Sequence, residues 1–112
     1  MTYFKTHMLG LIGSNPEIIK ISDDREICRF VVFHNYKSFD RDGKSQKKSQ
    51  KVTAFVHIPS QVQFLSKHAK IGDHILLVGN IENRQAHPSH GSDSVTMELH
   101  VRLNRGEVAL VK

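Results

Sequence analysis

The sequence predicts an all-β protein with a single helix, and two observations carry this prediction. Several stretches of the 112-residue chain alternate apolar and polar residues with the period of two that is typical of half-buried strands. Only one stretch combines helical spacing with residues suited to helix ends. A chain of this length supports one hydrophobic core rather than two. We therefore expect a single domain over residues 1–112.

Five segments are expected to form strands. The clearest runs from Lys51 to Ile58, where the even-numbered residues are all apolar and form a core face. The odd-numbered residues of this segment, from Lys51 to His57, face outward. The segment from Ser94 to Leu103 alternates in the same way, with its odd-numbered residues apolar from Val95 onward. The other strands are Met8 to Ile12, Ile27 to His34, and Leu76 to Ile81 with Gly79 marking a bulge or bend.

The segment that follows Pro59 is expected to form the helix. Ser60 and Gln63 have the spacing of a capping box, and Gly72 is placed to end the helix. The residues between them that follow helical spacing are Val62, Phe64, Leu65, His68, Ala69 and Ile71. The order is then three strands, one helix and two strands. This is the plan of the OB-fold, a five-stranded Greek-key barrel with its helix between strands 3 and 4, which often binds oligonucleotides.

The basic charge of the chain is concentrated in one segment. The net charge is +5 and the sequence pI is about 9.6, which suits an anionic partner such as nucleic acid. Residues 36–51 hold six Lys and Arg against two Asp, which is +4 of this total. Asp42-Gly43 at the middle is a turn signal, so we expect a long hairpin tip. Its cations are suited to follow phosphates while Tyr36 and Phe39 stack on bases.

Three short motifs are spaced along the chain in a pattern shared with one protein family. Gly10-Leu11-Ile12-Gly13-Ser14-Asn15-Pro16-Glu17 has the form Gly-x-x-Gly-x-x-Pro-Glu, Phe64 to Asp73 supplies a helix and a turn, and Ile75 to Ile81 supplies a strand with a glycine. In this order the chain resembles the bacterial and mitochondrial single-stranded DNA-binding proteins from about residue 4 to residue 103. The resemblance implies an OB-fold that assembles as a homotetramer or dimer and wraps single-stranded DNA.

The chain contains no tryptophan, although this family usually stacks bases on tryptophans. Depending on a one-residue choice of alignment, Lys51 or Val52 holds the first stacking position of the third strand, and His57 or Ile58 the second. The core face of that strand leaves the outward residues free to meet DNA, and these include Phe55 and His57. Stacking contributes about 1–3 kcal/mol per base. We therefore expect the basic residues to supply more of the affinity, which makes binding steeply salt-dependent.

The predicted DNA-binding residues are the cations and rings of the hairpin together with the rings of the following strand. They are Tyr36, Lys37, Phe39, Arg41, Lys44, Lys47, Lys48, Lys51, Phe55 and His57, with Arg29 and Arg84 as weaker candidates. A polar loop over residues 85–94 either clamps nucleic acid or is only a connection.

The sequence contains few groups of residues that could support catalysis or bind a metal ion. His87 and His90 form the only close histidine pair, and two ligands fall short of the three or four that zinc requires. Cys28 is the single cysteine, so a disulfide within the chain is impossible, and its apolar neighbours predict a buried, inert thiol. Asp23-Asp24 belongs to a turn, and no serine carries a motif that places a base beside it. We expect no enzyme activity, no metal and no cofactor.

The expected function is sequence-independent binding of single-stranded DNA in DNA replication, recombination and repair. The partners are then the DNA, further copies of the chain and replication or primosome proteins, in the bacterial cytoplasm with the nucleoid or in the mitochondrial matrix of a eukaryote. No membrane partner is expected, since no run of about 18 apolar residues is present.

Two alternatives remain open. The end of the chain, Arg105 to Lys112, lacks the acidic tail common in bacterial members of the family. That ending suits a primosomal replication protein N-like protein, a dimer that binds single strands and docks a helicase during replication restart. The second alternative is an RNA-binding OB domain of the cold-shock kind.

Overall fold

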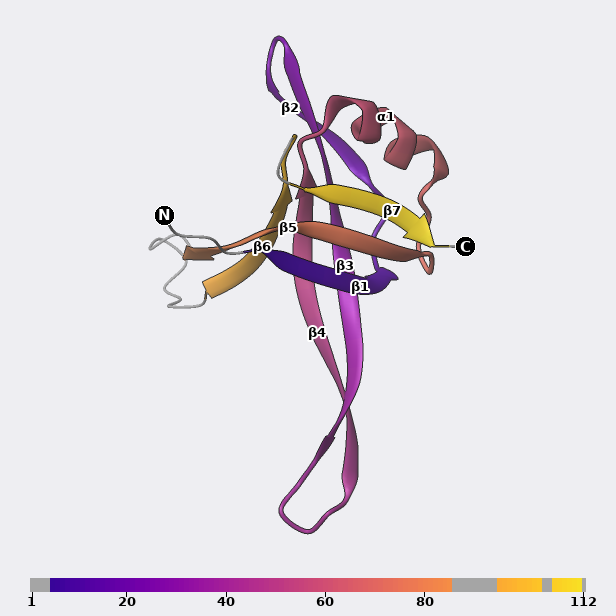
Figure 1. Ribbon diagram of the computed structural model, residues 1–112, viewed down its shortest axis with the longest axis vertical. Coiled ribbons are helices and arrows are strands. Elements are labelled where there is room, and N and C mark those ends of the chain that lie inside the picture. The colour runs from indigo at the N-terminus through magenta and orange to yellow at the C-terminus, as the bar shows by residue number, and fades with distance from the viewer. Residues whose placement is uncertain (1–4, 86–94, 104–105, 112) are drawn as a thin grey trace.

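The computed structural model describes residues 5–85, 95–103 and 106–111, which form a small β-barrel with one helix and a long projecting hairpin (Figure 1). The strands are β1 (Thr6–Ile12), β2 (Glu17–Ser22), β3 (Arg25–Phe39), β4 (Ser45–Val56), β5 (His74–Gln85), β6 (Val95–Val101) and β7 (Glu107–Val111). The helix, α1, spans Pro59–His68 and lies between β4 and β5 in the chain.

Five strands close the barrel in the order β1-β3-β4-β6-β5, and pairing of β5 with β1 completes the ring. All of these pairings are antiparallel except that of β4 with β6, which is parallel. The helix therefore lies between the third and fourth strands of the barrel, and the predicted OB-fold is confirmed. Strands β2 and β7 are additions that the sequence patterns did not predict. They pair with β3 and β5 respectively.

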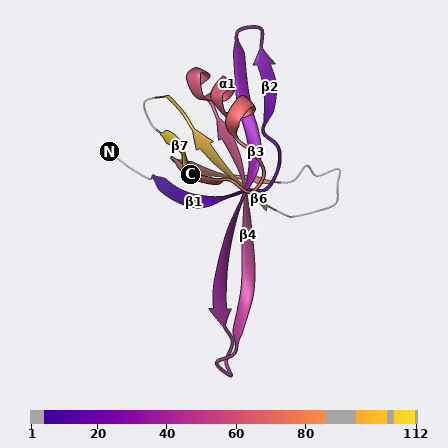
Figure 2. The same ribbon diagram turned by 90° about the vertical axis from the view of Figure 1, so that its right-hand side faces the viewer.

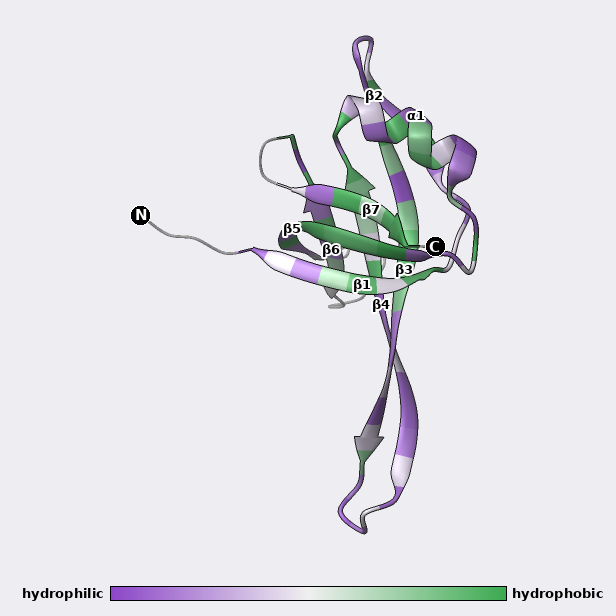
Figure 3. Ribbon diagram, turned by 45° about the vertical axis from the view of Figure 1, so that its right-hand side comes forward, coloured by the Kyte–Doolittle hydropathy of each residue, from purple (hydrophilic) through white to green (hydrophobic). Residues whose placement is uncertain are grey.

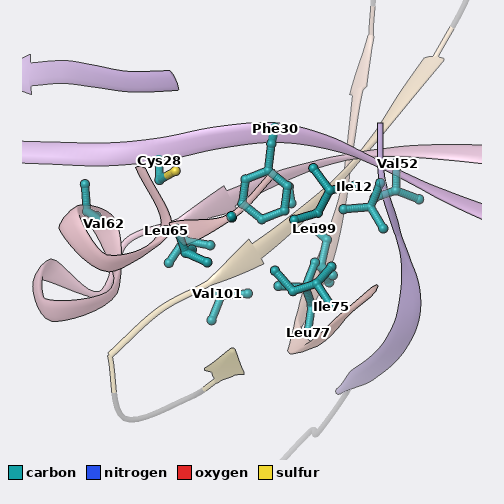
Figure 4. Close-up of a cluster of buried hydrophobic side chains, with 14 residues drawn as sticks. Ile12, Cys28, Phe30, Val52, Val62, Leu65, Ile75, Leu77, Leu99 and Val101 are labelled. Carbon is teal, nitrogen blue, oxygen red and sulfur yellow. The ribbon is translucent and has the colours of Figure 1, made fainter. Parts of the chain in front are cut away.

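The core fills the barrel between the strands and α1 (Figure 4). The predicted core face of β4 is confirmed, because Val52, Ala54 and Val56 are buried. Val62 and Leu65 of α1 are also buried, so the helix closes one end of this core. The prediction for Leu103 is wrong, since β6 ends at Val101 and the Leu103 side chain is 60% exposed.

The predicted ends of the helix are also wrong. Ile58 is the N-cap residue and no side chain caps the helix, so Ser60 and Gln63 form no capping box. Pro59 begins the helix instead, because its fixed φ suits the first helical position and it has no amide hydrogen to leave unpaired. The helix ends at His68, before Gly72. Gly72 has a φ of 95° in the following turn, and its amide donates a hydrogen bond to the carbonyl of Ile12.

Two glycines of the family-like motifs allow strands to approach closely. A Cβ atom at Gly10 would overlap β3, at the Val32 side chain and the Phe33 carbonyl oxygen. A Cβ atom at Gly79 would overlap the carbonyl oxygen of His100. Gly79 lies where β5 changes partner from β7 to β6. These positions therefore need glycine for space rather than for an unusual φ.

The β3–β4 hairpin extends far beyond the barrel, as Figures 1 and 2 show. We call residues 34–50 the ribbon. The sequence predicted a hairpin tip over residues 36–51, but the strands remain paired as far as Phe39 and Ser45, so the turn itself is only residues 40–44. The ribbon is hydrophilic along most of its length, in contrast to the barrel (Figure 3).

The turn of the ribbon is held by one carboxylate. Asp40 accepts hydrogen bonds from the amides of Asp42 and Lys44, both at 2.9 Å. The Asp40 amide donates to the carbonyl of Lys44, and Gly43 has a φ of 79°. The Asp42-Gly43 turn signal is therefore confirmed, and the turn has a defined conformation.

Two further features of the described residues bear on function. The thiol of Cys28 is buried, as predicted, and burial raises its pKa to about 11, so it stays protonated at neutral pH. The one helix of the described segments is too short and too polar to cross a membrane.

Candidate nucleic-acid interface

The ribbon has two faces, because side chains alternate along a strand and directly opposed residues point the same way. Lys37 is opposite Lys47, and Tyr36 is opposite Lys48. We call the two sides the odd face and the even face, after the numbers of their residues. Both faces carry candidate contacts for nucleic acid.

The odd face carries the denser positive charge. Lys37, Lys47 and Lys51 are exposed there, together with Phe39 near the turn. Within the described residues none of these lysines has an acidic partner. A hollow of about 430 Å³ lies over this part of the ribbon and is lined by Asn35, Tyr36, Lys37, Lys47, Lys48 and Ser49. The odd face continues onto the outside of the barrel, where Phe55 and His57 belong to the same side of β4.

The even face carries an aromatic pair beside a lysine. The rings of His34 and Tyr36 stack with their centroids 5.4 Å apart and their planes 12° apart. Tyr36 is 42% exposed, so much of its ring is accessible. Lys48 lies on the opposite strand, and Arg41 and Lys44 are exposed in the turn.

Phe55 and His57 lie on the outward side of β4 that the sequence predicted, but neither is fully exposed. Both are half-buried and pack against His100 of β6 across the parallel pairing. The Phe55 and His100 rings stack at 4.8 Å with planes 8° apart, and the His57 and His100 rings at 5.2 Å. We call Phe55, His57 and His100 the ring cluster. The three rings form one stack, with His100 contacting both of the others.

Hydrogen bonds and neighbouring charged side chains surround the ring cluster. His57 Nε2 and His100 Nδ1 share a hydrogen bond of 2.9 Å, while His100 Nε2 lies 3.0 Å from Glu98 and 3.2 Å from Glu82. Glu82 also pairs with Arg102 at 3.1 Å. Burial, with a further contribution from the positive charge of Arg102, lowers the pKa of His57 to about 4. His57 is therefore neutral at pH 7.

The weaker candidates and the histidine pair have different placements. Arg29 forms an ion pair of 2.8 Å with Glu17, so its charge is partly compensated. Arg84 lies in β5 opposite Thr96, and its side chain lies outside the described residues. His87, His90 and most of the 85–94 loop also lie outside them. Across residues 5–85, 95–103 and 106–111, no group of three or more His, Cys, Asp or Glu is placed to hold a metal ion.

The residues of the site that the sequence did not identify come from β5 and β6. His100, Glu98 and Arg102 have the outward parity of the segment from Ser94 to Leu103. That alternation was visible in the sequence, but it does not show which strand lies beside β6. Glu82 carried no signal of its own.

Comparisons with known proteins agree with this fold. Residues 3–108 match the single-strand binding protein family. A Plasmodium falciparum SSB in complex with ssDNA has a similar fold, with a TM-score of 0.88 and 18% identity over 100% of this chain and 97% of that one. The small single-stranded DNA-binding protein of Streptomyces coelicolor has a TM-score of 0.74 and 12% identity, over 99% and 96% of the two chains.

A third similar structure is a deletion mutant of the single-stranded DNA binding protein from Thermus aquaticus. It has a TM-score of 0.73 and 13% identity, over 96% of this chain and 50% of that one. No curated protein sequence matches the chain significantly. At these identities the structures show the shared fold, whereas the family match covers almost the whole sequence. The chain therefore belongs to the single-strand binding protein family.

Proposed function

We propose that this protein binds single-stranded DNA without sequence preference. The observation that carries the proposal is a projecting ribbon whose lysines have no acidic partners in the described structure, in a chain of the single-strand binding protein family. Unpaired lysines can release counterions from phosphates, which is the main source of sequence-independent affinity.

The proposed contacts divide between backbone and bases. Phosphates follow the odd face from Lys37 and Lys47 to Lys51. Further contacts come from Arg41 and Lys44 in the turn and from Lys48 on the even face, with Arg29 and Arg84 as weaker contacts on the barrel. Bases stack on the aromatic rings of Tyr36, Phe39, Phe55 and His57. Because Phe55 and His57 already stack on His100, a base that binds there adds to a preformed stack.

The biological role that fits such binding is protection of single strands during DNA replication, recombination and repair. It requires no catalytic step. We propose that the protein works as a homotetramer or dimer. Replication or primosome proteins, including a helicase, are its proposed protein partners.

A fluorescence anisotropy titration with labelled oligo(dT) at two salt concentrations tests the proposal. We expect tight binding at low salt, a steep loss at high salt and weaker competition by blunt duplex or by RNA of the same length. Absence of binding at low salt, or a preference for blunt duplex, would refute it. Native mass with and without oligonucleotide gives the oligomeric state. A dimer that captures a helicase more strongly than DNA would instead favour the primosomal role.

A further inference from the structure

Both faces of the ribbon offer contacts for DNA, although a strand that follows one surface uses only one of them. Lys37 and Lys47 lie directly opposite each other on the odd face, and Tyr36 and Lys48 do so on the even face. All four side chains are exposed. Like charges directly opposed across a two-stranded ribbon destabilise it. Phosphates beside the ribbon would relieve this repulsion, and the arrangement leaves room for a separate DNA backbone on each side.

The end of the ribbon carries an exposed aromatic ring. Phe39 forms the last pair before the turn, with Ser45, and its side chain is 69% exposed. It adjoins the turn that Asp40 holds through its two side-chain hydrogen bonds. Arg41 and Lys44 lie within that turn and are exposed. A large apolar side chain is therefore exposed close to cations, beside a turn of defined backbone conformation at the end of the projecting ribbon (Figure 1).

We propose that the ribbon inserts at a DNA fork, where the two strands of a duplex separate. A fork presents two diverging phosphate backbones and one exposed terminal base pair. The odd face then contacts one backbone through Lys37 and Lys47, and the even face contacts the other through Lys48. Phe39 stacks on the terminal base pair, in the way that apolar side chains of other proteins act as wedges between base steps.

This inference rests on the proposed function, because the ribbon can engage a fork only if its odd face binds a single strand. The intact duplex is the main competing ligand, since the major groove also admits a two-stranded β-ribbon. A groove, however, offers no exposed base-pair plane for Phe39. The test must therefore separate a fork from a blunt duplex and from a duplex with one single-stranded arm.

The experiment measures the affinity of the full chain for three labelled DNAs of equal total length. These are a duplex with two dT arms, a duplex with one dT arm that has the same number of unpaired nucleotides, and a blunt duplex. We expect the two-armed fork to bind about tenfold more tightly than the one-armed duplex, because only the fork offers a second phosphate backbone to Lys48, and a net hydrogen bond to a charged group is on this scale. The blunt duplex is expected to bind most weakly.

Matched variants assign this difference to the ribbon. Phe39→Ala should weaken binding of both armed DNAs by about tenfold, the scale of one lost stacking contact, because both have a terminal base pair at the junction. Phe64→Ala, which removes an exposed ring from α1, should leave both affinities unchanged. Lys48→Gln should weaken binding of the fork more than binding of the one-armed duplex, whereas Lys47→Gln should weaken both. With 5-iododeoxyuridine in the terminal pair of the fork, ultraviolet crosslinks should map to Phe39.

Several results would overturn the inference. These are equal affinity for the one-armed and two-armed DNAs, no effect of Phe39→Ala on either of them, and tightest binding to the blunt duplex. Crosslinks that map only to the barrel would also contradict it. Failure of the proposed function gives a different result, because oligo(dT) itself would then not bind. Circular dichroism of each variant, compared with that of the unmodified protein, confirms that lost binding does not reflect unfolding.

Discussion

Replacing the three lysines of the odd face should flatten the salt dependence of DNA binding. The variant changes Lys37, Lys47 and Lys51 to Gln, which keeps polar side chains at exposed positions and removes three charges. Each phosphate contact with a single strand contributes about 0.7 to the slope of log K against log salt. Three contacts therefore account for a slope of about 2. Between about 50 and 200 mM salt, the unmodified protein should lose about 20-fold more affinity than the variant.

Anisotropy titrations with oligo(dT) at four or five salt concentrations measure both slopes. The control variant changes Lys20, Lys67 and Lys70 to Gln. It has the same net charge, but its changes lie on β2, on α1 and in the following turn, away from the ribbon. We expect its slope to stay within about 0.5 of the unmodified value. Equal slopes for the two triple variants would refute the argument, because net charge rather than the odd face would then determine affinity.

Three further predictions concern stability. Leu65→Ala removes a fully buried core side chain and should lower the free energy of unfolding in urea by about 2–5 kcal/mol, whereas Phe64→Ala beside it should cost well under that. Gly79→Ala should cost about 1–3 kcal/mol through overlap with a β6 carbonyl, and a stability equal to that of the unmodified protein would show that the strands can separate there. The fold lowers the pKa of His57 from 6.5 to about 4. Between these pH values the unfolded chain is protonated at His57 and the folded chain is not, so the free energy of unfolding should fall as the pH drops below about 6.5. Discounted for the partial exposure of this ring, the loss by pH 5 should be about 1 kcal/mol, and thermal melts of His57→Gln should show a flatter pH profile.

The barrel was predictable because its strands carry a local signal. Val52, Ala54 and Val56 alternate with polar residues, and this period of two specifies a buried face whatever lies beside it. The one helix was predictable for the same reason, since Val62 and Leu65 follow helical spacing. Its ends were not, because the capping pattern is short and Pro59 gives an equally good start two residues earlier.

The ring cluster could not be predicted, because it depends on which strands become neighbours. Phe55 and His100 belong to strands separated in the sequence by α1 and β5, and the parallel pairing of β4 with β6 brings them together. Outward parity alone therefore does not show that His100 covers part of the Phe55 ring. The lysines of the ribbon, in contrast, lie where the sequence placed them, since hairpin pairing is local.

Strands β2 and β7 were missed although each carried a weak signal. Residues 18–21 include three isoleucines before the turn at Asp23-Asp24, and residues 108–111 are all apolar. Both segments are short and lie at edges of the sheet, where burial is partial and alternation is less distinct. The position of such edge strands is determined by the barrel that they join.

One strand, β3, connects the turn of the ribbon to the opposite end of the molecule. Its 15 residues span about 50 Å at about 3.3 Å per residue, close to the 54 Å length of the whole fold. The same strand pairs with β4 in the ribbon, with β1 in the barrel and with β2 at the far end. A mechanical load applied at Phe39 is therefore transmitted through one continuous backbone into the barrel, with no loop between them to act as a hinge.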